Sequence, residues 1–195
     1  MKKDMLLIVV DGLDGVGKDT HAQLIKKRYE NKGKKVIIRS HPETDNFYGR
    51  KTKKSLLGRG KRNRTKASVF YALDVIYSLK NYYRKGGCDV LIMVRYLMGT
   101  AYLPSKLATV AYNVFVKFVP LSDYMFFLDA PPDELLKRLQ KRKKREMFET
   151  LGALVKVRKR ALALAEGWHI IDTTQSIEQT YSSIEKILNK LDKES

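Results

Sequence analysis

A glycine-rich loop that joins an apolar segment to a helical one constrains this chain more than any other feature. Residues 5–11 form an almost continuous apolar run, as a strand buried on both faces requires. The segment that follows matches the pattern G-x-x-x-x-G-K and opens a helix closed by Gly33. Backbone N–H groups in such a loop curl round a phosphate, and Lys18 reaches the β- and γ-phosphates. We therefore predict a nucleotide-binding loop made of Gly12, Leu13, Asp14, Gly15, Val16, Gly17, Lys18, Asp19 and Thr20.

The last positions of this loop depart from the usual pattern. Asp19 stands where a serine or threonine hydroxyl normally holds Mg²⁺, and Thr20 is about 100° further round the helix. Carboxylate oxygens also suit Mg²⁺, so we expect Asp19 to be a metal ligand. An acidic residue in the first turn of a helix is also favourable for the helix dipole alone, and that alternative stays open.

Segments typical of strands and of helices alternate along the whole chain. Apolar strands are expected near residues 36–39, 89–94, 124–129 and 168–171, in addition to 5–11. Between them we expect helices near 18–31, 65–85, 103–118, 132–141, 149–166 and 176–191, with residues 40–63 as loop and some helix. Thr65 is predicted to cap the long second helix, with Val69, Ala72, Ile76, Leu79 and Tyr83 on its buried face.

This order predicts an α/β fold of the P-loop type, a three-layer sandwich. Its sheet has about five parallel strands with helices on both faces. We expect one domain over residues 1–195, with a small basic lid at about residues 137–149.

Charge and composition narrow the functional classes. The formal net charge is +18, and basic residues gather at 50–66 and 137–145, which predicts attraction to anions. No apolar run is long enough to span a membrane, and we interpret residues 5–11 as a strand rather than a signal peptide. The single cysteine, Cys88, cannot form an internal disulfide, which favours a cytoplasmic location. The three histidines lack the spacing of metal ligands.

Short motifs along nearly the whole chain carry a family resemblance. They are Val9-Val10-Asp11-Gly12-Leu13, Asp14-Gly15-Val16-Gly17-Lys18, His41-Pro42-Glu43, Gly49-Arg50, Phe70-Tyr71-Ala72, Arg95-Tyr96, Ala101-Tyr102, Leu128-Asp129-Ala130-Pro131-Pro132 and Glu146-Met147-Phe148-Glu149. With these motifs the chain resembles the thymidylate kinases. The resemblance implies ATP- and Mg²⁺-dependent phosphorylation of dTMP to dTDP, usually in a homodimer.

The resemblance also implies roles for individual residues. Asp14 would contact the sugar 3′-hydroxyl, Arg95 would clamp the acceptor phosphate, and Phe70 would stack on the base. The loop with His41 and Pro42 would receive the monophosphate, with His41 either touching the phosphate or serving structure only.

The lid would supply a catalytic arginine. Family members without an arginine inside the phosphate loop carry it in the lid, and here Gly15 and Val16 leave the loop without one. Arg142 or Arg145 is then expected to join Lys18 and Arg95 around the transferred group, since phosphoryl transfer needs positioning and charge stabilisation.

Three positions differ from the family pattern. Val94 replaces the aspartate of an Asp-Arg-Tyr signature, Thr44 replaces an arginine aimed at the acceptor phosphate, and Asp74 replaces an arginine that reads the base. If Asp74 lies at the edge of the base, its carboxylate favours an exocyclic amine over thymine O4. The alternative is that Asp74 faces solvent or pairs with a nearby cation.

Other functions compete with the dTMP assignment. The chain could phosphorylate a different nucleoside monophosphate. It could also be a nucleotide-gated protein whose charge serves a nucleic acid, although the basic stretches contain few aromatic residues and match no nucleic-acid module.

Overall fold

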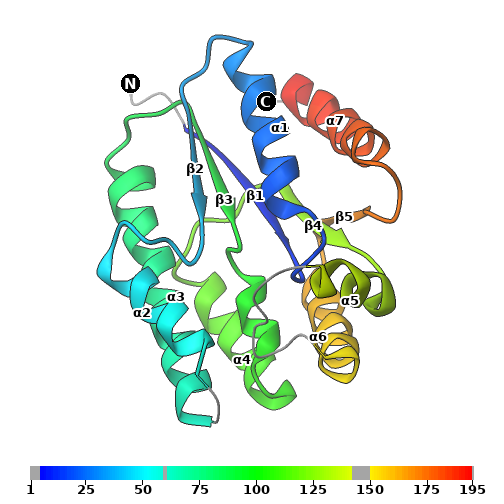
Figure 1. The fold of residues 1–195 in the computed structure, drawn as a ribbon. Coiled ribbons are helices and arrows are strands. Elements are labelled where there is room, and N and C mark those ends of the chain that lie inside the picture. The colour runs from blue at the N-terminus through cyan, green and yellow to red at the C-terminus, as the bar shows by residue number, and fades with distance from the viewer. Residues whose placement is uncertain (1–4, 59–60, 142–149, 195) are drawn as a thin grey trace.

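The computed structural model describes residues 5–58, 61–141 and 150–194 (Figure 1). Five parallel strands form one sheet in the order β2-β3-β1-β4-β5. These strands are β1 (Leu6–Gly12), β2 (Val36–Ser40), β3 (Val90–Val94), β4 (Met125–Asp129) and β5 (His169–Asp172). The predicted α/β fold with about five parallel strands is confirmed.

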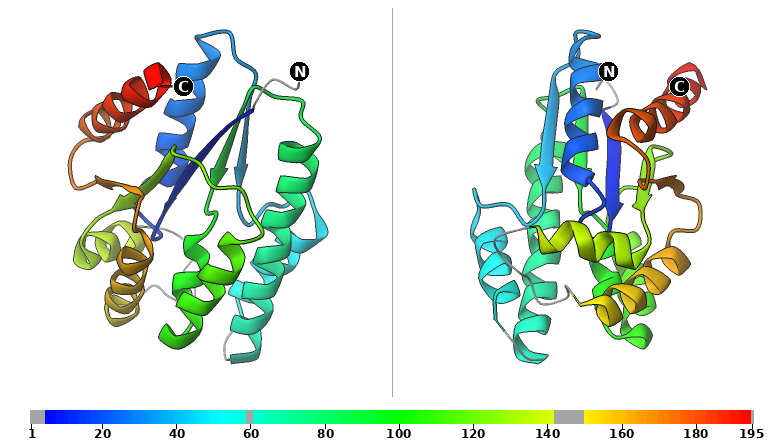
Figure 2. Two further views of the ribbon diagram at one scale, coloured as in Figure 1. Left: turned by 180° about the vertical axis from the view of Figure 1, so that it is seen from behind. Right: turned by 45° about the vertical axis from the view of Figure 1, so that its right-hand side comes forward.

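Helices connect the strands and cover both faces of the sheet. They are α1 (Lys18–Glu30), α2 (Phe47–Leu56), α3 (Lys61–Ser78), the π-helical η1 (Leu79–Arg84), the 3₁₀-helical η2 (Met98–Tyr102), α4 (Ser105–Val116), α5 (Pro132–Gln140), α6 (Leu151–Leu164) and α7 (Ile177–Glu194). Helices α1 and α7 lie together on one face, and the chain passes behind the sheet through α3, α4 and α6 (Figures 1 and 2). This arrangement follows the right-handed crossover that parallel strands require.

The core lies where the central strands are covered on both faces. Ile8, Val9 and Val10 of β1 and Leu91 and Ile92 of β3 are completely buried. Burial of an aliphatic side chain of this size contributes about 1.5–3 kcal/mol, so these continuous apolar strands commit the chain to a sheet covered on both faces. Because the strands are parallel, their carboxyl ends meet at one edge of the sheet, where ligands of such folds bind.

The long helix differs from its prediction in where it starts and in which face it buries. Helix α3 begins at Lys61, so Thr65 lies inside the helix and does not cap it. Val69 and Ile76 were expected in the core but are 53% and 44% exposed, whereas Asp74 and Ser78 are completely buried. Leu79 is buried as expected, so the expected face was wrong only in part, because hydrophobic periodicity treats polar residues such as Asp74 and Ser78 as solvent-facing.

The predicted lid falls largely outside the described residues. Residues 137–140 form the end of α5, and the segment 142–149, with Arg142 and Arg145, is not among the residues that the structure describes. The segment 40–63, expected to be loop with some helix, contains α2 as its helical part. Among the described helices, none has both the length and the apolar character that crossing a bilayer requires.

Candidate active site

The glycine-rich loop leaves the carboxyl end of β1 and enters α1, as predicted. Gly12 has φ +140°, and a Cβ there would come within 2.2 Å of the Leu128 carbonyl oxygen, so only glycine fits between β1 and β4. Gly17 precedes α1 in the left-handed conformation, with φ +89°. Leu13 and Val16 are buried beneath the loop, which holds its backbone against the sheet.

Lys18 lies inside this loop. Its Nζ donates hydrogen bonds to the carbonyl oxygens of Gly12 (2.9 Å) and Leu13 (2.6 Å) and is 3.7 Å from Asp14 Oδ1. Burial, together with repulsion from Arg95, lowers the pKa of Lys18 to about 8 against the attraction of neighbouring carboxylates. A phosphate in the loop would favour the charged form of this amine.

The backbone of Arg95, just after β3, is held on both sides. Its φ is +57°, its N–H donates to the Val10 carbonyl (3.2 Å), and its carbonyl accepts from the Tyr71 hydroxyl (2.6 Å). Asp11 fixes the next turn, because its Oδ2 accepts the backbone N–H groups of residues 96, 97 and 98 at 2.8–2.9 Å. Asp11 is 1% exposed and was not predicted as a site residue.

The guanidinium of Arg95 meets two carboxylates of the loop. Nη2 is 3.4 Å from Asp14 Oδ1, and Nη1 is 3.4 Å from Asp19 Oδ2 and 3.3 Å from Ser40 Oγ. Burial acts to lower the pKa of Arg95, but the attraction of Asp14 and Asp19 outweighs it and the pKa lies above its usual value. Asp14 also accepts a hydrogen bond from the Tyr102 hydroxyl (3.1 Å). The structure thus brings Asp14, Lys18, Asp19 and Arg95 together, as the sequence predicted.

Ser40, at the end of β2, begins the loop to α2. Its hydroxyl donates to Asp19 Oδ1 (2.5 Å), and its backbone N–H donates to Glu43 Oε1 (2.7 Å). Sequence reasoning missed Ser40, because only the pairing of β2 with β3 places it beside Arg95.

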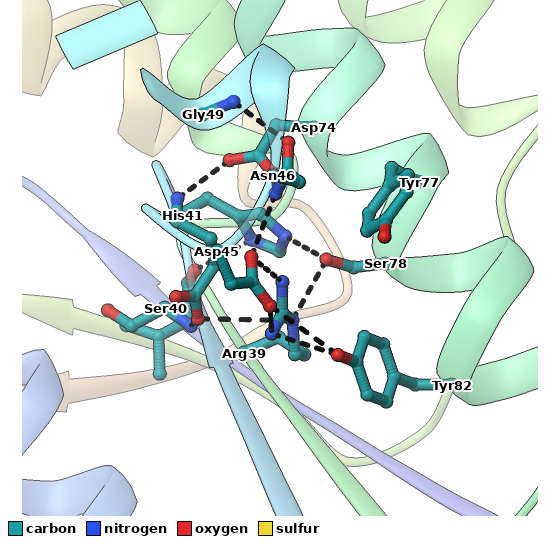
Figure 3. Close-up of polar contacts among 12 residues, drawn as sticks. Arg39, Ser40, His41, Asp45, Asn46, Gly49, Asp74, Tyr77, Ser78 and Tyr82 are labelled. Carbon is teal, nitrogen blue, oxygen red and sulfur yellow. Dashed lines mark hydrogen bonds and ion pairs between the residues drawn. The ribbon is translucent and has the colours of Figure 1, made fainter.

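His41 is fully buried beneath this loop (Figure 3). Its ring nitrogens lie 3.2 Å from the Val94 carbonyl and 3.0 Å from Ser78 Oγ, which also accepts from Arg39 Nε (3.1 Å). Burial lowers the pKa of His41 to about 3, so the ring is neutral. Of the two roles considered for His41, this geometry favours the structural one.

Asp74 is also buried, which corrects its expected place at the edge of a bound base. Its carboxylate accepts from the Glu43 N–H (2.8 Å) and from Asn46 Nδ2 (2.6 Å), so α3 holds the loop (Figure 3). Asn46 Oδ1 in turn accepts the N–H of Gly49 and caps α2. Asp74 therefore does not face solvent, and burial raises its pKa against the hydrogen bonds from Glu43 and Asn46 and the attraction of Arg39.

The remaining predicted contact residues come from three different parts of the fold, α3, the loop after β2 and α1. Phe70 is half-buried on α3, and its ring packs edge-on against Phe47 of α2 at 6.1 Å between centroids. Pro42 is half-buried in the loop after β2, and Thr20 is exposed on α1. On the other side of the phosphate loop, Arg138 of α5 donates to the Gly15 carbonyl (3.5 Å).

The exposed part of this cluster contains one carboxylate of the kind that ligates divalent cations. Mg²⁺ commonly binds one or two protein carboxylates and takes its other ligands from phosphates and water. Asp19 is beside Lys18 in the first turn of α1, and its side chain is 61% exposed. Within the described ranges, no group of three or more His, Cys, Asp or Glu residues could hold a metal by itself.

Comparisons with known proteins identify the family of this chain. The family model "Thymidylate kinase" matches residues 10–184. The "Probable thymidylate kinase" of Pyrococcus horikoshii is 30% identical over 190 residues, covering 91% of this chain and 92% of that protein. The corresponding protein of Thermococcus kodakarensis is 28% identical and covers 95% and 98%. The solved thymidylate kinase of Candida albicans has the same fold, with a TM-score of 0.76 at 18% identity over 97% of this chain and 93% of that chain. The chain therefore belongs to the thymidylate kinase family and is a nucleoside monophosphate kinase.

Proposed function

We propose that this protein transfers the γ-phosphoryl group of ATP to dTMP, giving dTDP and ADP. The observation that carries the proposal is the position of Arg95, whose guanidinium lies between the carboxylates of the phosphate loop and the hydroxyl of Ser40. A cation at this point can hold an acceptor phosphate next to the donor loop. The names of the related proteins support dTMP as the acceptor.

Phosphoryl transfer requires the protein to position the two substrates and to stabilise the charge on the phosphate oxygens. An oxygen of the acceptor phosphate attacks the γ-phosphorus, and the bond to the β,γ-bridging oxygen breaks to release ADP. Lys18 would turn from the Gly12 and Leu13 carbonyls to the β- and γ-phosphates, and Arg95 would hold the acceptor. Arg142 or Arg145 would add the arginine of the lid.

Asp19 would hold Mg²⁺ in place of the usual loop hydroxyl. Mg²⁺ bound there would neutralise charge on the β- and γ-phosphates. A carboxylate beside a triphosphate is repelled unless a cation bridges the two, so the nucleotide itself favours this role. The geometry that supports it is the exposure of Asp19 next to Lys18.

A second copy of the chain would bind the apolar face of α4. Leu107, Val110 and Val114 repeat at helical spacing and are 56%, 59% and 50% exposed. Only Lys106 and Lys117 carry charge between residues 105 and 118, so the middle of this face offers a second copy no like charge. Contiguous exposed apolar surface of this kind marks an interface in many soluble proteins.

We also assign the protein to the cytoplasm, because a free thiol is typical of a reducing compartment. Cys88 is a free cysteine, half-buried, with its Sγ 3.6 Å from Met5 Sδ.

The experiment that tests the function is ADP release with a panel of dTMP, dUMP, dCMP, dAMP and dGMP. We expect the highest kcat/KM with dTMP and strict dependence on Mg²⁺. If another monophosphate gives the highest kcat/KM, the protein is still a monophosphate kinase but dTMP is not its preferred substrate. No ADP release with any monophosphate would refute the proposal.

A further inference from the structure

Asp19 makes contacts that a metal ligand would have to give up. Its Oδ1 accepts the Ser40 hydroxyl at 2.5 Å, and its Oδ2 lies 3.4 Å from Arg95 Nη1. The Asp19 carboxylate therefore already binds one nitrogen of Arg95, the residue that an acceptor phosphate needs.

Ser40 connects Asp19 and Arg95 to the loop between β2 and α2, which is expected to receive the acceptor. Its hydroxyl is 3.3 Å from Arg95 Nη1 as well as bonded to Asp19. Its backbone N–H is bound by Glu43, whose own N–H is held by Asp74. Asp19 is thus connected to a loop that α3 holds in place.

Arg95 can change partners only through its side chain. Its backbone is bonded to Val10 and Tyr71, and Asp11 fixes the turn that follows. The Arg95 side chain is 25% exposed and that of Asp19 beside it is 61% exposed, so a ligand can reach the guanidinium from the side of Asp19.

We propose that Asp19, seated by Ser40, is a positioning residue that alternates between Arg95 and the Mg²⁺ of the bound nucleotide and so couples donor binding to acceptor binding. The inference rests on the proposed function, in which Arg95 holds the acceptor phosphate. Without Mg²⁺-nucleotide the acceptor phosphate must compete with Asp19 for Arg95. With it, Asp19 turns to the metal and Arg95 is available to the acceptor.

The size of the effect follows from the exposure of the pair. Charge pairs that solvent reaches contribute a factor of about 1.4 to 5 in equilibrium constants. Coupling between two ligands is reciprocal, so Mg²⁺-nucleotide is expected to strengthen acceptor binding about 1.4- to fivefold, and the acceptor to strengthen nucleotide binding equally.

Calorimetry tests this proposal by measuring the Kd of dTMP with and without a non-hydrolysable Mg²⁺–ATP analogue. We expect Asp19→Asn to bind dTMP about 1.4- to fivefold more tightly than wild type without the analogue, because the competing charge is gone. In this variant the analogue should leave the Kd of dTMP nearly unchanged. Asp123→Asn, which removes an exposed carboxylate just before β4, is the matched control and should behave as wild type.

Three results would overturn the proposal. They are a wild-type coupling factor of one, an Asp19→Asn variant with unchanged coupling, and an Asp19→Asn variant that binds dTMP more weakly than wild type. Failure of the proposed function would look different, because it would leave no ADP release with any monophosphate. If the panel identifies another acceptor, the same titrations are done with that monophosphate.

Discussion

His41 makes the stability of the acceptor loop sensitive to acid. The ring is fully buried between the Val94 carbonyl and Ser78, and burial lowers its pKa to about 3. In the unfolded chain a histidine titrates near its ordinary pKa of about 6.5. Between these two values the unfolded chain binds more protons than the folded one, so the free energy of unfolding falls as the pH is lowered through 6.5.

The magnitude follows from the two pKa values. One extra proton on the unfolded chain changes the free energy of unfolding by about 1.4 kcal/mol per pH unit once the pH is below 6.5. With a folded pKa of about 3, the loss between pH 7.5 and pH 5.0 is on the order of 2 kcal/mol. Above pH 6.5 the contribution is nearly constant.

Urea denaturation at pH 7.5 and 5.0 measures this loss in wild type, His41→Gln and Ser78→Ala. His41→Gln removes the titrating ring, so its pH-dependent loss should be smaller than that of wild type by about 2 kcal/mol. Ser78→Ala removes a hydrogen bond but keeps the ring, and should keep most of the wild-type pH dependence. His21, whose pKa burial also lowers, is present in all three proteins and cancels in the comparison.

Two observations would refute the reasoning. One is an equal loss of stability in wild type and His41→Gln over this pH range. The other is an NMR titration in which the His41 ring of the folded protein becomes protonated near pH 6.5.

Other predictions concern the phosphate loop, the lid and the subunit interface. Lys18→Ala should lose about 2–4 kcal/mol of transition-state stabilisation in kcat/KM, and activity within twofold of wild type would contradict the assignment. Because the pKa of Lys18 is about 8 and a bound phosphate raises it, ATP binding at pH 8.5 should take up about 0.7 proton, which calorimetry in buffers of different ionisation enthalpy measures; no uptake would count against it. Either Arg142→Ala or Arg145→Ala should lower kcat about 10³-fold with little change in ATP affinity. Full activity of both variants would contradict the assignment of a catalytic arginine to the lid. Val110→Lys should convert a homodimer into monomers in light scattering, whereas Val155→Lys on α6 should not, and a dimeric Val110→Lys protein would exclude the α4 face.

The sequence predicted the sheet well because its strands are buried on both faces. Segments such as residues 90–94 are apolar at every position, so no choice of face is needed to recognise them. The phosphate loop was predicted for a similar reason, since its glycines and Lys18 act within one short segment. Such local patterns carry their own geometry.

Side chains that act across elements could not be predicted in the same way. Asp11 binds three amides of residues 96–98 only because β1 pairs with β3 in a register that sets Val10 beside Val94. Asp74 was expected at the edge of a bound base because it stands where the family has a base-reading arginine. The structure differs because the loop from β2 supplies its carboxylate with two donors. Burial of a carboxylate is tolerated when hydrogen bonds of this kind satisfy it.

Two positions depart from the usual pattern in complementary ways: Val94 lacks a carboxylate that the family signature has, and Asp19 adds one in the phosphate loop. Val94 is completely buried at the end of β3, so this position offers no carboxylate to a nucleotide-bound metal. Asp19 puts one beside the Arg95 guanidinium, in the first turn of α1, where the helix dipole stabilises an anion. Burial acts to raise the pKa of Asp19, but Arg95 and the Ser40 hydroxyl outweigh it and the pKa lies below its usual value. The carboxylate is therefore ionised at neutral pH, and its placement on the donor side of Arg95 is what allows one acidic residue to respond to both substrates.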